Sequence, residues 1–91
     1  MRIRGGDYRE ITENLADQIA RIVRSIRQLD LKKAPSVSET IDWARTLLLM
    51  HATELEPELV RATLNVLLKF QSDIELVDLE VPSMVRRAGG S

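Results

Sequence analysis

The sequence predicts an all-α fold, a small three- to four-helix bundle, on three observations. Apolar residues recur at steps of three or four along most of the chain, which is the spacing of one helix face. Prolines at positions 35, 57 and 82 divide this pattern into segments, because proline interrupts a continuing helix. All four glycines lie within the first six or the last three residues, so the interior has no glycine-dependent turn.

The chain of 91 residues is short enough to form one domain at most. The predicted helical domain spans residues 7–81, between a flexible lead-in at residues 1–6 and a flexible tail at residues 82–91. Aromatic residues make up only 3% of the chain, so aliphatic side chains are expected to fill the core.

The first helix is expected to begin near Asp7, because Asp7 and Glu10 have the spacing of a capping box. Its predicted core face is a continuous apolar stripe formed by Tyr8, Ile11, Leu15, Ile19, Ile22, Ile26 and Leu29. The other face carries Arg21, Arg24 and Arg27. These arginines form either a partner-binding stripe or, as most helix surfaces do, a solvated basic face.

The second helix is expected from about Val37 to Met50 or Ala52, since Ser36 and Glu39 form a second capping box directly after Pro35. Its predicted buried stripe consists of Val37, Ile41, Ala44 and Leu48. Further apolar residues spread around its later turns, namely Trp43, Leu47, Leu49 and Met50. A helix that is apolar on several sides usually lies between neighbours, so this helix is predicted to be central. Trp43 is interpreted as a core residue in preference to a stacking platform for a ligand.

The third helix is predicted to begin at Pro57, which suits the first helical position, and to end near Ser72. Its broad apolar face consists of Leu59, Val60, Thr63, Leu64, Val66, Leu67 and Phe70. Residues 74–81 fit neither period cleanly, and a short fourth helix is preferred because no second strand lies nearby to pair with them. Pro82 is expected to end this helix.

Composition excludes several classes of function. No glycine-rich phosphate loop occurs, so the chain alone is not expected to be a catalytic ATPase. Cysteine is absent and His51 is the sole histidine, which leaves no paired-histidine or thiolate metal site and no serine triad, and hence no predicted catalytic or metal-binding residue. His51 is interpreted instead as a cap at the end of the second helix.

The charge is divided between the two parts of the chain. Residues 1–33 carry eight basic against five acidic residues, and the remainder carries five against nine. This balance favours a protein partner and gives little of the basic surface that nucleic-acid binding needs. No segment is long and apolar enough to span a membrane and no export leader opens the chain, so a cytoplasmic location is expected.

Three stretches together resemble the C-terminal lid subdomain of MoxR-type AAA-plus ATPases, in the branch encoded beside von Willebrand factor A domain proteins. They are Asp30–Arg45, Leu55–Leu64 and Leu67–Phe70. Proline-serine-valine, aspartate-tryptophan-alanine and leucine-x-proline-glutamate elements recur in them in the order of the family, and the similarity covers about residues 15–75.

This resemblance implies a helical lid that closes over ATP and magnesium held by a nucleotide-binding core, at a subunit boundary of a ring that is usually a hexamer. Such proteins are chaperone-like remodellers that help to assemble or activate protein complexes with a von Willebrand factor A domain partner. The chain itself would hold no cofactor, because the nucleotide loop and its magnesium-binding acidic pair belong to the core. Its partner would be that AAA-plus core.

Many family members have a sensor arginine just after the proline matched by Pro35, where this chain has Ser36 and Val37. Lys32, Lys33 and Arg45 are the candidate substitutes, since each lies near the same helix start. The residues expected near the nucleotide are therefore Lys32, Lys33 and Ser36, and the helix that Ser36 begins could face an anion. The alternative function is a stand-alone helical protein–protein interaction module that binds through Arg21, Arg24 and Arg27.

Overall fold

The computed structural model describes the backbone of residues 5–89 and the side chains of residues 13–89. It contains four helices and no strand within these residues, which confirms the predicted all-α bundle. The helices are α1 (Gly5–Arg27), α2 (Val37–Leu49), α3 (Pro57–Leu67) and α4 (Gln71–Arg87). None of them is both long and apolar enough to cross a bilayer.

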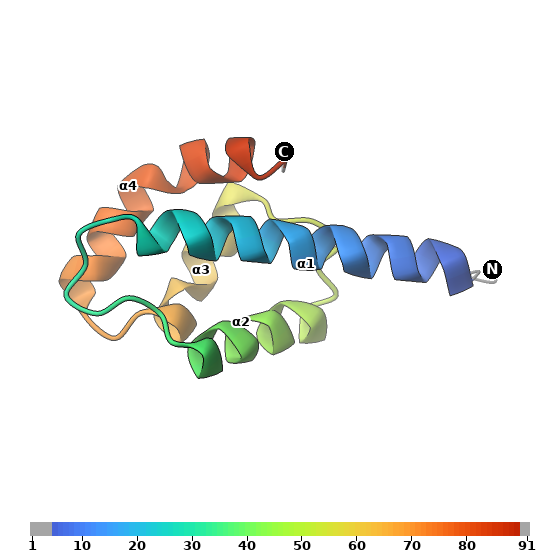
Figure 1. The fold of residues 1–91 in the computed structure, drawn as a ribbon, viewed down its shortest axis with the longest axis horizontal. Coiled ribbons are helices and arrows are strands. Elements are labelled where there is room, and N and C mark those ends of the chain that lie inside the picture. The colour runs from blue at the N-terminus through green and yellow to red at the C-terminus, as the bar shows by residue number, and fades with distance from the viewer. Residues whose placement is uncertain (1–4, 90–91) are drawn as a thin grey trace.

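Each helix packs against two others, so that α1 and α3 each contact both α2 and α4. Figure 1 shows α1 running along the middle of the molecule, with α2 on one side and the C-terminal half of α4 on the other. The core fills the space between them and consists mainly of aliphatic residues, as expected, with Trp43 as its largest side chain. A buried Gln18 side chain accepts the Leu55 N–H at 2.7 Å and thereby fastens the α2–α3 loop to α1.

Helix α1 follows its predicted pattern where side chains are described. Leu15, Ile19, Ile22 and Ile26 are buried, and Leu29 packs partly buried against them. The helix begins at Gly5, inside the predicted lead-in. The side chains of Asp7, Tyr8, Glu10 and Ile11 lie outside the described residues, so their predicted capping and packing stay predictions.

Helix α2 begins where it was predicted, but two expectations about it are wrong. Its buried face is formed by Glu39, Trp43 and Leu47, and not by the predicted stripe. In that stripe Val37 is 67% exposed, Ile41 46% and Leu48 48%, and Ala44 is partly buried. The helix is also not central. It packs mainly against α3, which receives Trp43 and Leu47, and its other apolar side is left facing solvent.

Helix α3 begins at Pro57 as predicted, but it ends at Leu67 rather than near Ser72. Val60, Thr63, Leu64 and Leu67 are buried on its predicted face, whereas Phe70 is 44% exposed. Phe70 is extended, with φ of −106° and ψ of 135°, and serves as the N-cap residue of α4. Residues 68–70 therefore form an extended linker between α3 and α4, where the apolar pattern predicted the last turn of the third helix.

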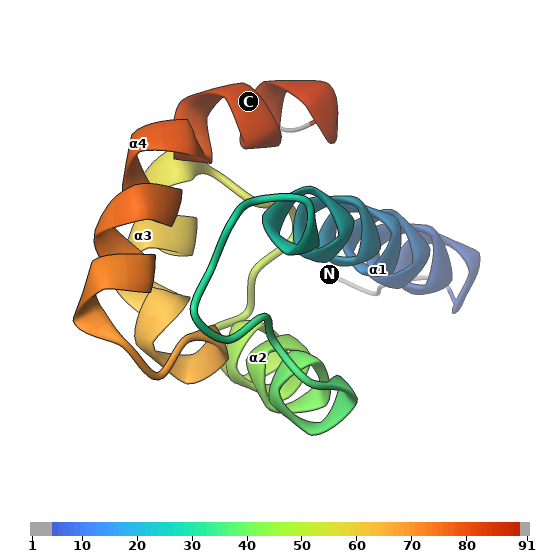
Figure 2. The same ribbon diagram turned by 60° about the vertical axis from the view of Figure 1, so that its left-hand side comes forward.

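Helix α4 continues through Pro82 to Arg87, so the predicted helix end at Pro82 is wrong. Figure 2 shows that α4 is bent, which is the usual consequence of a proline inside a helix. Beyond the proline, Met84, Val85 and Ala88 are buried. Most of the residues assigned to the tail at 82–91 therefore belong to the core-forming part of the chain, because bending lets the last turns of α4 cover α1.

Candidate docking groove

The start of α2 is held by a clasp centred on Glu39. The Ser36 hydroxyl accepts the Glu39 N–H at 3.1 Å, and the Ser36 N–H donates to Glu39 Oε1 at 2.9 Å. The second carboxylate oxygen, Oε2, lies 3.8 Å from Lys33 Nζ and 3.2 Å from Lys69 Nζ. The predicted capping box is thus confirmed, and its carboxylate also joins the α1–α2 loop to the α3–α4 linker.

The Glu39 carboxylate is buried, at 8% exposure, yet it stays charged. The backbone N–H of Ser36 is the main cause that lowers the pKa of Glu39 from 4.5 to about 2, aided by Lys69 and Lys33 and opposed by desolvation. Neither lysine makes a hydrogen bond of regular geometry to Oε2, so their contribution is mainly the attraction of two nearby charges.

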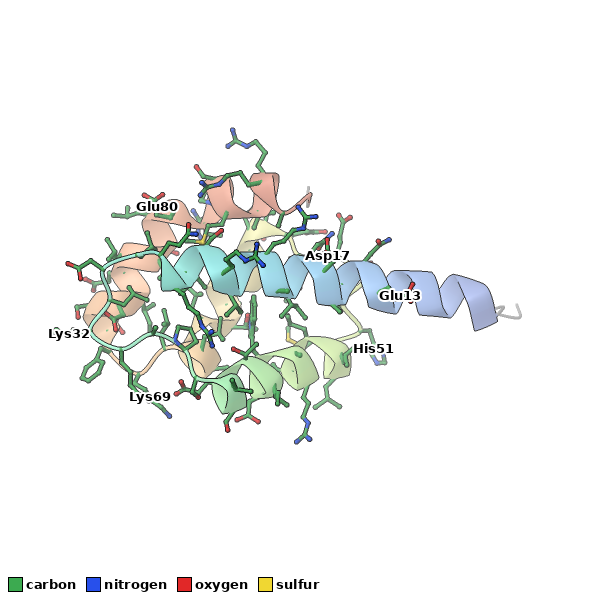
Figure 3. All side chains as sticks on the ribbon, in the orientation of Figure 1. Glu13, Asp17, Lys32, His51, Lys69 and Glu80 are labelled. Atoms are coloured by element: carbon green, nitrogen blue, oxygen red, sulfur yellow. The ribbon has the colours of Figure 1, made fainter. Side chains whose placement is uncertain are left out.

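A second buried carboxylate fixes the loop that precedes the clasp. Asp73, in the first turn of α4, accepts the Lys32 N–H at 2.9 Å and the Lys33 N–H at 3.1 Å. The Lys32 ammonium lies 5.6 Å from the centre of the Phe70 ring. Figure 3 shows Lys32 and Lys69 at the same end of the molecule, on the two connections that the clasp holds together.

The structure brings the three predicted nucleotide-proximal residues, Lys32, Lys33 and Ser36, to this one place. Within the fold, however, they have other partners. The Glu39 carboxylate and the Ser36 hydroxyl already accept the Ser36 and Glu39 N–H groups at the start of α2, two of the donors that an anion there could use. Arg45 is exposed and lies more than two turns further along α2, where it makes no hydrogen bond or ion pair with any described residue.

The three arginines of α1 are all exposed but are not equivalent. Arg21 forms an ion pair with Asp17 at 2.8 Å, and Arg27 Nη2 donates to the Pro35 carbonyl at 3.0 Å. Arg24 makes no hydrogen bond or ion pair within the described part of the chain. Arg24 and Arg27 also line a hollow between α1 and α2, so this arginine face borders an apolar surface.

The hollow between α1 and α2 consists of two adjoining basins, which we call the α1–α2 groove. The larger basin has a volume of about 460 Å³ and is lined by Ala20, Val23, Arg24, Arg27, Gln28, Val37, Thr40 and Ile41. The smaller has a volume of about 260 Å³ and is lined by Leu15, Ala16, Ile19, Ala20, Thr40, Ala44 and Leu48. Ala20 and Thr40 line both basins, so the two basins lie next to each other between α1 and α2.

Small side chains explain why this groove exists. Ala16 and Ala20 on α1 and Ala44 on α2 supply only methyl groups where the two helices face each other. They cannot fill the space between the helix axes, so the two helices contact each other less than α2 contacts α3. The larger residues of α2, Ile41 and Leu48, stand at the edge of the space and remain about half exposed.

The α2 side of this groove is the stripe that the sequence predicted as core. Val37, Ile41, Ala44 and Leu48 do form one stripe, as predicted, but it is a surface stripe. A signal was present in the sequence, because Trp43 and Leu47 form a second apolar face on the same helix. A short helix with two such faces needs two neighbours to bury both, and only α3 covers one of them closely.

Comparison of this chain with protein-family models, with curated proteins and with solved structures found no match.

Proposed function

We propose that this chain is the lid subdomain of a MoxR-type AAA-plus ATPase, and that it works by docking on the nucleotide-binding core of that protein. The observation that carries this proposal is the exposed apolar stripe of α2 along the α1–α2 groove. Val37, Ile41 and Leu48 together present an apolar surface with no partner among the described residues. Surfaces of this kind in small soluble domains mark protein contacts.

The motifs of the family-like stretches support the same proposal through their structural roles. Pro35 and Ser36 set the start of α2, Trp43 and Leu47 anchor α2 on α3, and Pro57 begins α3. They fix the position of α2 relative to α3 and leave the groove side of α2 free. A lid needs this combination, because it must keep its own shape while it presents a docking surface.

In this proposal the chain binds no cofactor by itself, and ATP and magnesium belong to the core. The complete protein would form a hexameric ring and remodel protein complexes together with a von Willebrand factor A domain protein. The lid would influence hydrolysis by the way it closes on the core. Lys32 and Lys33, in the loop before α2, and Ser36, at the start of α2, are the residues that would lie nearest to the nucleotide.

Two measurements test the proposal. Calorimetry with ATP and magnesium should show no binding to the isolated chain tighter than millimolar, and a micromolar dissociation constant would contradict the separation of lid and core. A MoxR-type AAA-plus core supplied as a separate protein should bind the chain, and Ile41→Asp should abolish that binding. The matched control is Leu79→Asp, since Leu79 is a 76% exposed residue of α4. Equal binding by both variants would refute docking through the groove.

The second candidate function is a stand-alone helical interaction module that binds through Arg21, Arg24 and Arg27. The observation in its favour is that Arg24 has no charged partner among the described residues, although it lies beside an apolar groove. Reversal of all three charges to glutamate should then abolish binding of an identified protein partner while the thermal midpoint changes little, because these side chains are exposed. Retention of that partner by the reversed variant would exclude this function.

A further inference from the structure

We propose that the occupant of the α1–α2 groove is an amphipathic helix whose acidic residues gather at one end, over Arg24 and Arg27. This inference rests on the proposed docking function and names the chemistry of the surface that docks. It follows from the shape of the groove, from the hydrogen-bonding state of its walls and from the distribution of charge along it.

The shape of the groove suits a helix. Its lining on α2 runs from Val37 to Leu48, which spans about 16 Å at the rise of an α-helix. Its floor is formed by the methyl groups of Ala16, Ala20 and Ala44, and Ile41 and Leu48 stand along its edge. An elongated apolar groove between two helices receives side chains at steps of three and four from the face of a third helix.

The walls of the groove exclude an extended occupant on energetic grounds. Both walls are helices, whose backbone N–H and C=O groups are already paired within each helix. A strand laid between them would leave its own backbone groups unpaired against an apolar floor, and each unpaired group would be costly to bury. A helical occupant satisfies its own backbone and therefore avoids this penalty.

The charge along the groove is uneven. Arg24 and Arg27 line the basin next to the start of α2, whereas the lining of the other basin carries no charge. Asp17 also lies on α1, but it is engaged by Arg21 at 2.8 Å. Glu13 lies on α1 before the first lining residue, beyond the uncharged basin. The charge among the residues that line the two basins is therefore positive and lies at one end.

Arg45 adds a cation on the outer border of the groove. It follows Ile41 by four residues and precedes Leu48 by three, so all three project from the same side of α2. Arg45 thus lies beside the uncharged basin, nearer to Leu48 than to Val37, and the carboxylates of a docked helix would meet Arg24 and Arg27. Complementary charges of this kind fix the orientation of a docked helix more than they raise its affinity.

The test uses a fluorescein-labelled synthetic helical peptide of about 16 residues, long enough to fill the groove. It carries leucines at helical steps of three and four and glutamates in its first two turns, and binding to the full chain is followed by fluorescence anisotropy. We expect saturable binding that weakens as sodium chloride is raised. Replacement of Arg24 and Arg27 by glutamate should weaken binding by about tenfold or more, since two attractive contacts become repulsive.

Matched controls distinguish binding in the groove from non-specific binding of the peptide to other apolar or basic surfaces. Leu48→Asp should abolish binding and Leu79→Asp should not, although both residues are exposed leucines on helices. Arg86→Glu with Arg87→Glu reverses two exposed arginines at the far end of α4, on the other side of α1 from α2, and should leave binding unchanged. A peptide of the same composition in scrambled order should bind at least tenfold more weakly, because it cannot present one apolar face (about 1.4 kcal/mol).

Three outcomes would overturn the inference: no saturable binding, equal binding of the scrambled peptide, or equal loss with the α4 control variants. Formation of a dimer that Leu48→Asp disrupts and the peptide does not displace would also overturn it, since a second copy would then be the occupant. If an AAA-plus core binds through the groove and the peptide does not, the proposed function stands and only the chemistry assigned to the occupant fails.

Discussion

The indole N–H of Trp43 on α2 donates a 2.7 Å hydrogen bond to the hydroxyl oxygen of Thr63 on α3. The Thr63 hydroxyl lies 2.9 Å from the Leu59 carbonyl in the preceding turn, to which it donates its own proton. Both side chains are buried, with Trp43 fully so. This contact joins the two helices at the centre of the core and gives the buried indole the polar partner it requires.

Thr63→Val should therefore destabilise the fold by about 1–3 kcal/mol, because it keeps the shape of the side chain but leaves the Trp43 N–H unpaired. Chemical denaturation followed by Trp43 fluorescence measures this change in the free energy of unfolding. Thr63→Ser retains the hydroxyl oxygen that accepts the Trp43 N–H, so this variant should lose less stability than Thr63→Val. Equal losses for the two variants would show that the hydrogen bond contributes nothing beyond packing.

Glu39→Gln should lower stability at pH 7 by about 1 kcal/mol, because glutamine keeps an oxygen that can accept the Ser36 N–H but loses the negative charge that strengthens this bond and attracts Lys33 and Lys69. The pKa of Glu39 is lowered from 4.5 to about 2, so its stabilising contribution is present above pH 4.5 and is lost as the pH falls toward 2. The stability difference between wild type and Glu39→Gln should shrink over the same interval, as measured by denaturant titrations at several pH values.

The control for this pH dependence is Glu80→Gln. Glu80 is exposed on α4 and makes no hydrogen bond or ion pair with any described residue. Because Glu80 lacks such contacts, its replacement should change the free energy of unfolding at pH 7 by less than about 0.5 kcal/mol. A difference between wild type and Glu39→Gln that stays constant from pH 7 to pH 2 would show that the Glu39 carboxylate is not the titrating group.

His51→Gly should stabilise the protein by about 1 kcal/mol. His51 has a φ of 60°, and it lies just after α2 in a Schellman turn, where its N–H donates to the Leu48 carbonyl and the Ala52 N–H donates to the Leu47 carbonyl. His51 thus lies at the end of α2 and takes part in its capping turn through its backbone N–H, while the predicted contribution of its side-chain charge stays a prediction. Glycine adopts this left-handed conformation without the steric penalty of a β-carbon, which is about 1–2 kcal/mol.

Thermal unfolding followed by circular dichroism measures the effect of His51→Gly. Met50→Gly is the matched control, because Met50 precedes His51 but has a φ of −85° that any residue adopts. That variant should be destabilised by about 0.5–1 kcal/mol, since glycine only adds freedom to the unfolded chain. Stabilisation by both variants would rule out relief of backbone strain as the cause.

Met84→Ala should cost about 2–5 kcal/mol, as removal of a buried side chain usually does. Met84 is 2% exposed and follows Pro82 in α4. Ser83→Ala at an exposed neighbouring position should change stability by less than about 0.5 kcal/mol. Denaturant titration measures the free energy of unfolding of both variants. If Met84→Ala left this free energy unchanged, the residues after Pro82 would not contribute to the core.

Local patterns in the sequence determined the helices and their starts. The Ser36 and Glu39 capping box, Pro57 at the first position of α3 and the apolar stripe from Leu15 to Ile26 depend on contacts within a few residues of each other. Such contacts form in the same way whatever surrounds them. The all-α fold, the approximate bounds of α1 and α2, and the start of α3 could therefore be predicted.

The tertiary structure decided which faces are buried and where the helices end. Pro82 remains inside α4 because the bent helix can place Met84 and Val85 in the core, and burial of these side chains offsets the lost backbone hydrogen bond. The stripe of Ile41 and Leu48 remains at the surface because α3 receives the opposite face of α2, where Trp43 finds Thr63. Periodicity locates an apolar face, but only the neighbouring helices determine whether that face becomes core or groove.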